Sequence, residues 1–376
     1  MASPSSPSPA SPSNLTRWYM DTRPLTATNQ SLPLLSTLQG SDQTTVKAFY
    51  HLSDRHMSLA SYLLKYLFIH RTCRVPWGQI VISRTPAPHK RPCYIPPQPQ
   101  QPSLSGDDNQ SAAPLAPIPN IEFNVSHQAS LVALAGCISP SPPSVEETLP
   151  PQPRVNLSSN TNAHASHPSS SPSPPQIGID ITCTDDPARR NRGPPKTEAE
   201  LHAFIDIFAE VFSTNELDAM KAYPRTNSNS GAAMSLQESI THRLRLFYTY
   251  WALKEAYIKM TGEALLAPWL RDLEFRDVVV PTPPALSPSA AADACLQWGV
   301  PETGVRAMLY GREVPEVRLE VVAFGNDYIF ATAGRGGGFG NPVGQEELKA
   351  RWDEFRLVDI ERDVAPCASG ECECLD

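Results

Sequence analysis

The stretch Leu236–Gly262, LQESITHRLRLFYTYWALKEAYIKMTG, carries the clearest structural signal in the chain. Its apolar and aromatic residues recur at helical spacing, and Gly262 is typical of a helix C-cap. Trp251, Glu255 and Lys259 fall at positions i, i+4 and i+8. One stripe of the predicted helix therefore carries a ring, a carboxylate and an ammonium group. Taken alone, the two charges indicate no more than a surface ion pair that contributes about 0.3–0.5 kcal/mol.

Proline-rich segments divide the rest of the chain. With 376 residues, 40% of them hydrophobic, the protein can bury a substantial core. Its 40 prolines are clustered, however, which is typical of globular segments interrupted by non-globular ones. We expect a disordered tail over residues 1–14 and disordered insertions over 96–118 and 139–176, because these Ser-, Pro- and Gln-rich stretches cannot build a core.

The remaining segments predict an α+β fold. A helix is expected after Asp54, a plausible N-cap, and a second, amphipathic helix is expected to break near Ser213. Strand patterns occur in the following segments: 78–85, a hairpin over 121–137 with its loop at 126–130, 177–183, and several segments after the central helix. A basic, proline-fixed turn is expected over 89–96. The order strand, helix, strands occurs twice, so we expect a pseudo-twofold pair of similar α/β subdomains, although the two halves show no sequence self-similarity. The expected division is 15–118, 119–345, and a C-terminal helix with an acidic, cysteine-containing tail over 346–376.

Charge and cysteine content exclude several classes of protein. The net charge of −8 argues against a nucleic-acid-binding protein with a broad basic face. The N-terminus has no secretory signal pattern, and no apolar stretch is long enough to span a membrane. The eight cysteines show no CxxC spacing and predict reduced thiols in a cytoplasmic protein. For Cys367, Cys372 and Cys374 we weigh a soft-metal or redox role against a frayed tail and favour the tail.

Polar residues interrupt the predicted hairpin at FNVSHQ, residues 123–128. The simplest interpretation of Ser126, His127 and Gln128 is a turn whose side chains bond their own backbone. A Ser-His-acid hydrolase is disfavoured, because adjacent strand residues point to opposite faces and no glycine elbow flanks Ser126.

Asp180 is a single acid in the apolar strand IGIDITC, residues 177–183. It is either an edge-strand acid or a buried carboxylate that needs a partner or a cation. Asp180 and Glu255 together could share Mg²⁺, a cation that prefers oxygen ligands and often bridges phosphates. Basic side chains that suit a pyrophosphate ligand occur at Arg55, Lys90 and Arg91, without a Walker loop or GxGxxG.

In this order, FNVSHQ, GIDI and FYTYWALKEAYIK resemble the large, surfactin-synthetase-activating type of phosphopantetheinyl transferase. That family is marked by an FNxSH strand, a G(I/V)D strand and a helix with WxxKEAxxK. Further similar segments are SDRHMSLASYLLKYL, HKRPCYIP and DYIFATA, so the resemblance runs from about residue 16 to 335. The proline-rich insertions resemble those of filamentous-fungal members.

The resemblance implies a pseudo-twofold α+β fold that binds coenzyme A between its halves as a monomer. The enzyme would be a holo-[acyl-carrier-protein] synthase, moving the 4′-phosphopantetheine arm onto a serine of an apo acyl or peptidyl carrier protein and releasing adenosine 3′,5′-bisphosphate. The carriers implied belong to fatty acid synthesis, to polyketide and nonribosomal peptide synthesis in secondary metabolism, and to lysine biosynthesis.

The resemblance also implies residue roles. Asp180 and Glu255 would hold Mg²⁺ on the pyrophosphate, and Glu255 would also be the general base. Phosphates would be contacted by the following side chains: Lys254 and Lys259, with Lys259 at the leaving group, Ser126 and His127 at the 3′-phosphate, and Arg55, Lys90 and Arg91 at the nucleotide. Displacement at phosphorus depends on positioning and electrostatic stabilisation, which such groups supply.

The chain departs from the family pattern at Thr182. Many relatives read GxDxE and carry a second acid there, on the same strand face as the aspartate. Because a hydroxyl is a poor substitute for a carboxylate ligand, we expect water or the amide oxygen of Gln128 as the third metal ligand. The alternative functions are a non-catalytic module of the same fold that binds coenzyme A or a carrier protein, and, least favoured, the Ser126–His127 hydrolase.

Overall fold

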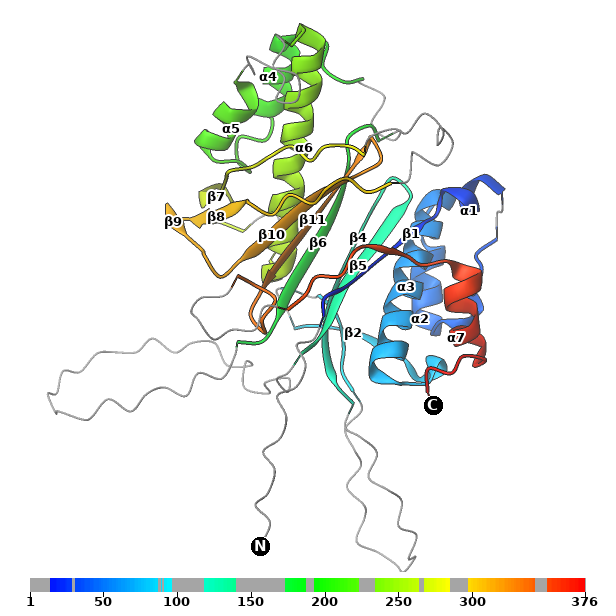
Figure 1. The fold of residues 1–376 in the computed structure, drawn as a ribbon. Helices are drawn as coiled ribbons and strands as arrows, with labels where there is room; N and C mark the ends of the chain where they lie inside the picture. The colour runs from blue at the N-terminus through cyan, green and yellow to red at the C-terminus, as the bar shows by residue number, and fades with distance from the viewer. Residues whose placement is uncertain are drawn as a thin grey trace, which may run out of the picture.

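A computed structural model shows a mixed α+β protein with two central sheets, each covered by one long helix (Figure 1), and two small sheets of two and three strands. The predicted tail and insertions lie almost wholly outside the residues that the structure describes. The described residues are 14–28, 31–86, 89, 91–96, 118–139, 173–186, 193–222, 234–263, 267–284, 297–341 and 350–375. Within these ranges, no helix has both the length and the apolar character needed to cross a bilayer.

The first sheet has the strand order β12-β1-β5-β4. Its strands are β1 (Thr16–Asp21), β4 (Asn120–Gln128), β5 (Leu131–Ser139) and β12 (Arg356–Leu357). Helix α3 (Leu52–Cys73) covers one face, and its apolar side chains form a core with Phe123, Val132 and Leu134. This helix confirms the one expected after Asp54, although it begins three residues earlier, with His51 in place of Asp54 as its N-cap.

The second sheet has the order β10-β11-β6. It consists of β6 (Gln176–Cys183), β10 (Arg318–Phe324) and β11 (Tyr328–Arg335). Helix α6 (Leu236–Thr261) packs on it and ends at Gly262, whose φ of 83° is left-handed, as the C-cap signal predicts. A third apolar cluster, which includes Leu131 of β5 and Ile179 of β6, fills the space between the two sheets.

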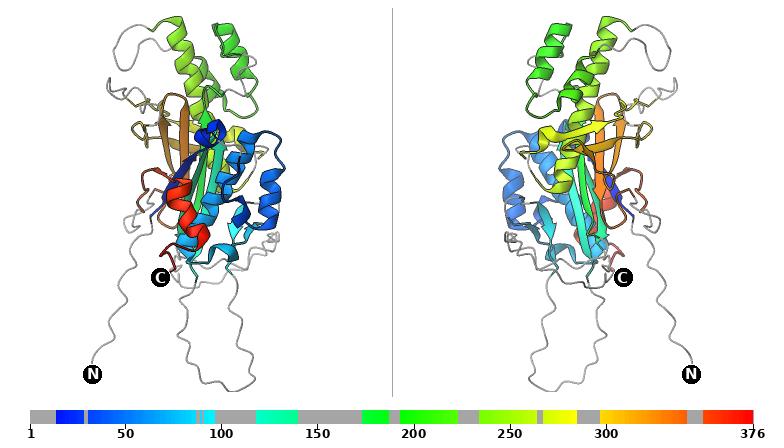
Figure 2. Two further views of the ribbon diagram at one scale, coloured as in Figure 1. Left: turned by 90° about the vertical axis from the view of Figure 1, so that its right-hand side faces the viewer. Right: turned by 90° about the vertical axis from the view of Figure 1, so that its left-hand side faces the viewer.

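Smaller elements surround this framework. Helices α4 (Glu198–Asp206) and α5 (Thr214–Lys221) lie beside the N-terminal part of α6, beyond the strands (Figure 2), and Ser213 between them forms a capping box. The others are α1 (Arg23–Thr28), α2 (Gly40–Lys47), β2 (Ile82–Arg84), β3 (Pro92–Tyr94), β7 (Leu273–Arg276), β8 (Arg306–Leu309), β9 (Arg312–Glu313) and α7 (Ala365–Ser369). The small sheets are β2-β3 and β7-β8-β9. Single turns occur at Leu35–Thr37, Trp77–Gln79, Leu270–Asp272 and, as a π-helix, Ile360–Val364.

Side chains of β4 join the two sheets. Asn124 Oδ1, Ser126 Oγ and Gln128 Oε1 accept hydrogen bonds from the backbone N–H groups of residues 179, 181 and 183 in β6, at 3.2, 3.2 and 3.1 Å. Because side chains two residues apart share one strand face, the alternate polar residues of FNVSHQ satisfy alternate N–H groups of β6. The FNVSHQ motif therefore holds the two sheets together, whatever further role its side chains have.

Gly178 brings α6 directly against β6. A Cβ at this position would lie 2.0 Å from the carbonyl oxygen of Ala256 and 2.4 Å from the amide nitrogen of Met260. Only glycine allows this approach of helix backbone to strand backbone. As a result, the helix side chains near residue 256 stand beside those of the GID strand.

Four predictions differ from the structure. The loop expected at 126–130 is confined to Ala129 and Ser130, both with positive φ, because the polar residues before it are held in β4 by their bonds to β6. The basic, proline-containing segment at 89–96, read as a turn, includes strand β3, since Pro92 opens a short strand where its missing N–H is tolerated.

The other two concern boundaries. The division at residue 119 separates the β4–β5 hairpin from β1, the strand with which β5 pairs. The tail expected to fray is packed over residues 350–375: β12 pairs with β1, and Val364 and Cys367 are buried in the α3 core. Both differences arise from long-range strand pairing, which local patterns do not reveal.

Candidate active site

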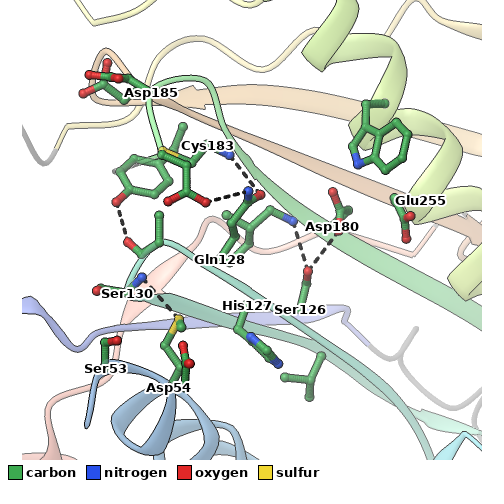
Figure 3. Close-up of a pocket in the computed structure, with 18 of the residues that line it drawn as sticks. Ser53, Asp54, Ser126, His127, Gln128, Ser130, Asp180, Cys183, Asp185 and Glu255 are labelled. Atoms are coloured by element: carbon green, nitrogen blue, oxygen red, sulfur yellow. Dashed lines mark hydrogen bonds between the residues drawn. The ribbon is translucent and has the colours of Figure 1, made fainter. Parts of the chain in front are cut away.

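A pocket of about 970 Å³ opens between the two halves. Its walls come from the start of α3, the β4–β5 hairpin, β6, α6 and the turn before β11 (Figure 3). Trp251, Glu255 and Lys259 all line it, which confirms that the stripe predicted on the helix shares one face. Concave sites with convergent polar groups are the usual places for ligands.

Asp180 is the hub of the polar groups in the pocket and is 5% exposed. Its Oδ1 accepts from the ammonium group of Lys259 at 2.7 Å and from Ser126 Oγ at 3.0 Å, and its Oδ2 accepts from Thr182 Oγ1 at 2.9 Å. Lys259 also donates to Ser126 Oγ at 2.8 Å. Lys259 therefore pairs across to β6, and the surface ion pair with Glu255 along the helix is not formed.

Glu255 faces the same cluster without joining its hydrogen bonds. Burial raises the pKa of its carboxyl group above the usual value, the charge of Asp180 raises it further, and Lys259 partly offsets both. Two carboxylates that raise one another's proton affinity suit a shared cation, because a divalent ion would relieve their repulsion. Both carboxylates that the sequence suggested as a metal pair therefore line the same pocket.

His127 and Ser126 point to opposite faces of β4, as consecutive strand residues do. Ser126 is buried beside Asp180, whereas His127 has an exposed side chain on the pocket wall. Desolvation by the walls lowers the pKa of His127 below its usual value, and the positive charges of Lys259 and Lys65 lower it further. No nucleophile–base contact between Ser126 and His127 results, so this arrangement does not support the hydrolase.

Gln128 lines the pocket but is turned away from Asp180. Its amide oxygen accepts from the Cys183 N–H, and its amide nitrogen donates to Asp186 Oδ2 at 3.3 Å (Figure 3). The oxygen that was expected to reach the metal is therefore used to hold β4 against β6. Gln128 therefore does not present its amide oxygen to Asp180.

Lys254 corrects the expectation that both lysines of the helix contact phosphate. Its side chain is 0% exposed, its ammonium group forms an ion pair with Glu216 at 2.9 Å, and it donates to the carbonyls of Leu270 and Leu273. Neighbouring positions in a helix differ by about 100° in direction, so Lys254 points into the α5–β7 side while Glu255 faces the pocket.

The basic residues upstream are only partly brought to the pocket. Arg55 lies next to the pocket residue Asp54, but its Nε donates to the Phe49 carbonyl at 2.6 Å. Arg91 forms an ion pair with Glu122 and donates to the Ile177 carbonyl at 3.2 Å, which joins β3, β4 and β6. Lys90 lies outside the described residues.

Several pocket residues were missed from the sequence. Asp54 was interpreted as a helix cap, but it projects into the pocket from the first turn of α3. Asp185 and Asp186 follow β6, and Arg23 and Tyr328 reach the pocket from the first positions of α1 and β11. The two adjacent acids directly after a buried strand could have indicated a site there, because the loops at strand ends often carry functional residues.

Comparison with known proteins agrees with this geometry. Residues 25–139 match the N-terminal domain of 4′-phosphopantetheinyl transferases, and residues 176–301 match the 4′-phosphopantetheinyl transferase superfamily. The 4′-phosphopantetheinyl transferase A of Aspergillus fumigatus is 53% identical over 370 residues, which cover 96% of each chain. The chain belongs to the 4′-phosphopantetheinyl transferase family.

Two further relatives mark the breadth of this phosphopantetheinyl transferase family. NpgA of Emericella nidulans is 49% identical over 369 residues, 96% of each chain. The L-aminoadipate-semialdehyde dehydrogenase-phosphopantetheinyl transferase of Mus musculus is 22% identical over 231 residues, 61% of this chain and 50% of the mouse protein. The likeness to the fungal enzymes extends over nearly the whole chain, which confirms the transferase and carrier-protein activation over the non-catalytic binding module.

Proposed function

We propose that the pocket binds coenzyme A and positions it for transfer of its 4′-phosphopantetheine arm to a serine of an apo carrier protein. The observation that carries this is the Lys259–Asp180–Ser126 cluster with Glu255 beside it, in a pocket wide enough for a nucleotide. The product left behind is adenosine 3′,5′-bisphosphate.

Asp180 and Glu255 fit Mg²⁺. They supply oxygen donors from two elements that Gly178 allows to lie in close contact. Burial and then the charge of Asp180 raise the pKa of Glu255, and a divalent cation would offset both effects. When bound, Mg²⁺ would neutralise charge on the pyrophosphate. Thr182 would orient Asp180 by its hydrogen bond, and water would complete the coordination.

The chain's own side chains support each remaining role. Lys259 presents an ammonium group where negative charge develops on the leaving phosphate, and Asp180 and Ser126 hold it in place. Glu255 accepts the proton of the carrier serine from its place on the pocket wall.

The nucleotide end is assigned to the outer pocket. His127 contacts the 3′-phosphate with its exposed imidazole. Ser126, on the buried face of β4, is the second side chain assigned to this end of the ligand. Arg55, Lys90 and Arg91 stay predicted nucleotide contacts. If Arg91 binds the nucleotide, its guanidinium must donate hydrogen bonds to a phosphate and to Glu122 at the same time.

We further propose that the two helix-on-sheet halves are related by a pseudo-twofold axis, so that one chain forms the complete pocket as a monomer. The carriers are those of fatty acid, polyketide and nonribosomal peptide synthesis, and of the lysine-biosynthesis reductase. The name of the mouse relative supports the last of these.

The test is transfer from coenzyme A to a panel of purified apo carrier proteins with Mg²⁺, followed by mass spectrometry. We expect a carrier mass gain equal to the phosphopantetheine arm. Asp180→Ala and Glu255→Ala should each abolish transfer while circular dichroism stays native, and Glu313→Ala, at an exposed acid of β9, is the matched control. Near-normal transfer by either pocket variant would refute the assigned metal pair.

A further inference from the structure

The C-terminal segment brings three cysteines to one histidine of α3. Cys367, Cys372 and Cys374 follow one another in the pattern C-x4-C-x-C, and His70 lies about three hundred residues earlier in the last turn of the helix. The four possible ligand atoms, three Sγ and one imidazole nitrogen, all lie within 4.8 Å of one another. Three thiols and a buried imidazole do not gather in this way by local sequence alone.

The distances among these atoms suit a tetrahedral metal ion. A Zn–S bond of about 2.3 Å separates two sulfur ligands of a tetrahedral zinc by about 3.8 Å. The Sγ atoms of Cys367 and Cys374 have this separation, 3.8 Å. His70 Nε2 lies 3.1 Å from Cys372 Sγ, so a movement of about 0.5 Å brings this pair to the roughly 3.6 Å that a nitrogen and a sulfur ligand of one zinc require. The separation of the two sulfurs is too large for a disulfide, whose S–S bond is about 2.05 Å.

Only one nitrogen of the His70 imidazole is free to coordinate a metal ion. The ring is 1% exposed, and its Nδ1 lies 2.7 Å from the carbonyl oxygen of Val75. A carbonyl only accepts, so Nδ1 carries the proton and donates it, which leaves the lone pair of Nε2 directed at the cysteines. A metal-binding histidine in proteins almost always donates its other ring N–H in this way.

Arg71 offsets the charge of such a cluster. Three thiolates with one divalent zinc carry a net charge of −1, and the guanidinium of Arg71 lies beside Cys367. Its Nη2 donates to the carbonyl of Asp363 at 2.9 Å, so it is fixed at the join between α3 and the C-terminal segment.

We propose that His70, Cys367, Cys372 and Cys374 bind one Zn²⁺ ion that fastens the C-terminal segment to α3. A set of one nitrogen and three sulfur ligands is closed, with no open position for a substrate, so the site is structural. Its effect is to anchor the chain beyond β12 against the helix whose first turn supplies Asp54 to the active-site pocket. The site does not depend on the transferase assignments.

The first experiment measures metal content. The full chain is expressed with zinc in the medium, purified with a phosphine reductant and no chelator, and analysed by inductively coupled plasma mass spectrometry. We expect about one zinc per chain, loss to background in Cys372→Ser and Cys374→Ser, and full retention in Cys93→Ser, a partly exposed cysteine outside the cluster. Asp180→Ala should also retain its zinc, which separates this site from the carboxylate pair.

The second experiment identifies the ligands. Replacing zinc with Co²⁺ should give the intense thiolate-to-cobalt and tetrahedral ligand-field absorption bands, whereas oxygen ligands in the active-site pocket give neither. A chelator should lower the Tm of the wild type and of Cys93→Ser, and should leave that of Cys374→Ser unchanged.

The wild-type protein alone can overturn the proposal, even if a variant fails to fold. Zinc at background level, with all three cysteines freely alkylated in the native protein, would refute it. So would a Cys367–Cys374 disulfide in protein purified without reductant, or cobalt spectra without thiolate bands.

Discussion

Thr182 shows how a residue that departs from the family pattern is used. It stands on the same face of β6 as Asp180 and donates to its Oδ2 at 2.9 Å, so a hydroxyl orients the carboxylate from the place where many relatives have a second acid. The stripe Trp251–Glu255–Lys259 could be predicted from the fixed period of the helix, whereas the difference at Thr182 was expected only from the resemblance to the family. The sequence could not predict that Gln128 would be committed to Cys183, because that depends on how two sheets meet.

His127 should control recognition of the 3′-phosphate. We expect His127→Ala to raise the KM for coenzyme A by about 10- to 100-fold, the equivalent of a hydrogen bond to a charged group. The KM for 3′-dephospho-coenzyme A should not change. Because the pKa of His127 is lowered, its imidazole is neutral at pH 7, and coenzyme A should bind more tightly as the pH falls through that pKa. Steady-state kinetics with both substrates across pH test this; an equal rise in both KM values would contradict it.

Lys65 should make stability depend on alkaline pH. Burial lowers the pKa of this lysine to about 8, partly opposed by Asp42. Between pH 8 and the unfolded value near 10.5, the unfolded chain binds more protons, so stability should rise with pH across this window. We expect Lys65→Met to remove that rise and to stabilise the protein by about 3.5 kcal/mol at pH 7, since the pKa is lowered from 10.5 to about 8 and each pKa unit corresponds to about 1.4 kcal/mol. Urea unfolding at pH 7 to 10.5 measures it, and an unchanged slope would disprove the assignment.

At the scale of elements, the contact between α6 and β6 decides the site. Gly178→Ala would force the helix away, since a Cβ meets the backbone of Ala256 and Met260. We expect a loss of about 1–3 kcal/mol in stability and about 100-fold in kcat, because a displacement of about 1 Å moves Lys259 from Asp180. Gly40→Ala, in α2 with open space around it, is the control and should leave both unchanged. A Gly178→Ala enzyme with wild-type kcat would contradict this account.

The two lysines of α6 should separate stability from catalysis. Glu216 closes the capping box of α5 and accepts from the Phe275 N–H while it pairs with Lys254, so α5, α6 and β7 share one buried ion pair. Lys254→Met leaves that carboxylate unpaired and should cost about 3–5 kcal/mol in unfolding free energy without changing the KM for coenzyme A. Lys259→Met should lower kcat and cost less stability than Lys254→Met, because Lys259 is partly exposed and Asp180 keeps its hydrogen bonds from Ser126 and Thr182. Denaturant unfolding and kinetics on both variants distinguish them; a raised KM in Lys254→Met would restore its phosphate role.

At the scale of the molecule, local patterns predicted the two long helices and most strands. They did not predict the return of the C-terminal segment. Strand β12 pairs in parallel with β1, and the residues after it pack on α3. The pairing partners lie more than three hundred residues apart, so no periodicity within either segment encodes it. The same long-range closure creates the cysteine–histidine cluster, which the sequence showed only as three cysteines near one end.

The two sheets should unfold as one unit because a buried ion pair crosses between them. Arg17 of β1 pairs with Glu320 of β10, both side chains nearly inaccessible, and its guanidinium also lies 4.5 Å from the ring of Phe355. Glu320→Ala leaves a buried cation unpaired and should destabilise the protein by about 3–5 kcal/mol, whereas the double variant Arg17→Met with Glu320→Leu should recover most of that loss. Urea unfolding followed by circular dichroism and by tryptophan fluorescence should give coincident transitions for the wild type. If the double variant loses as much stability as the two single variants together, the ion pair does not couple the halves. Separate unfolding transitions in the wild type would show that the two sheets fold independently.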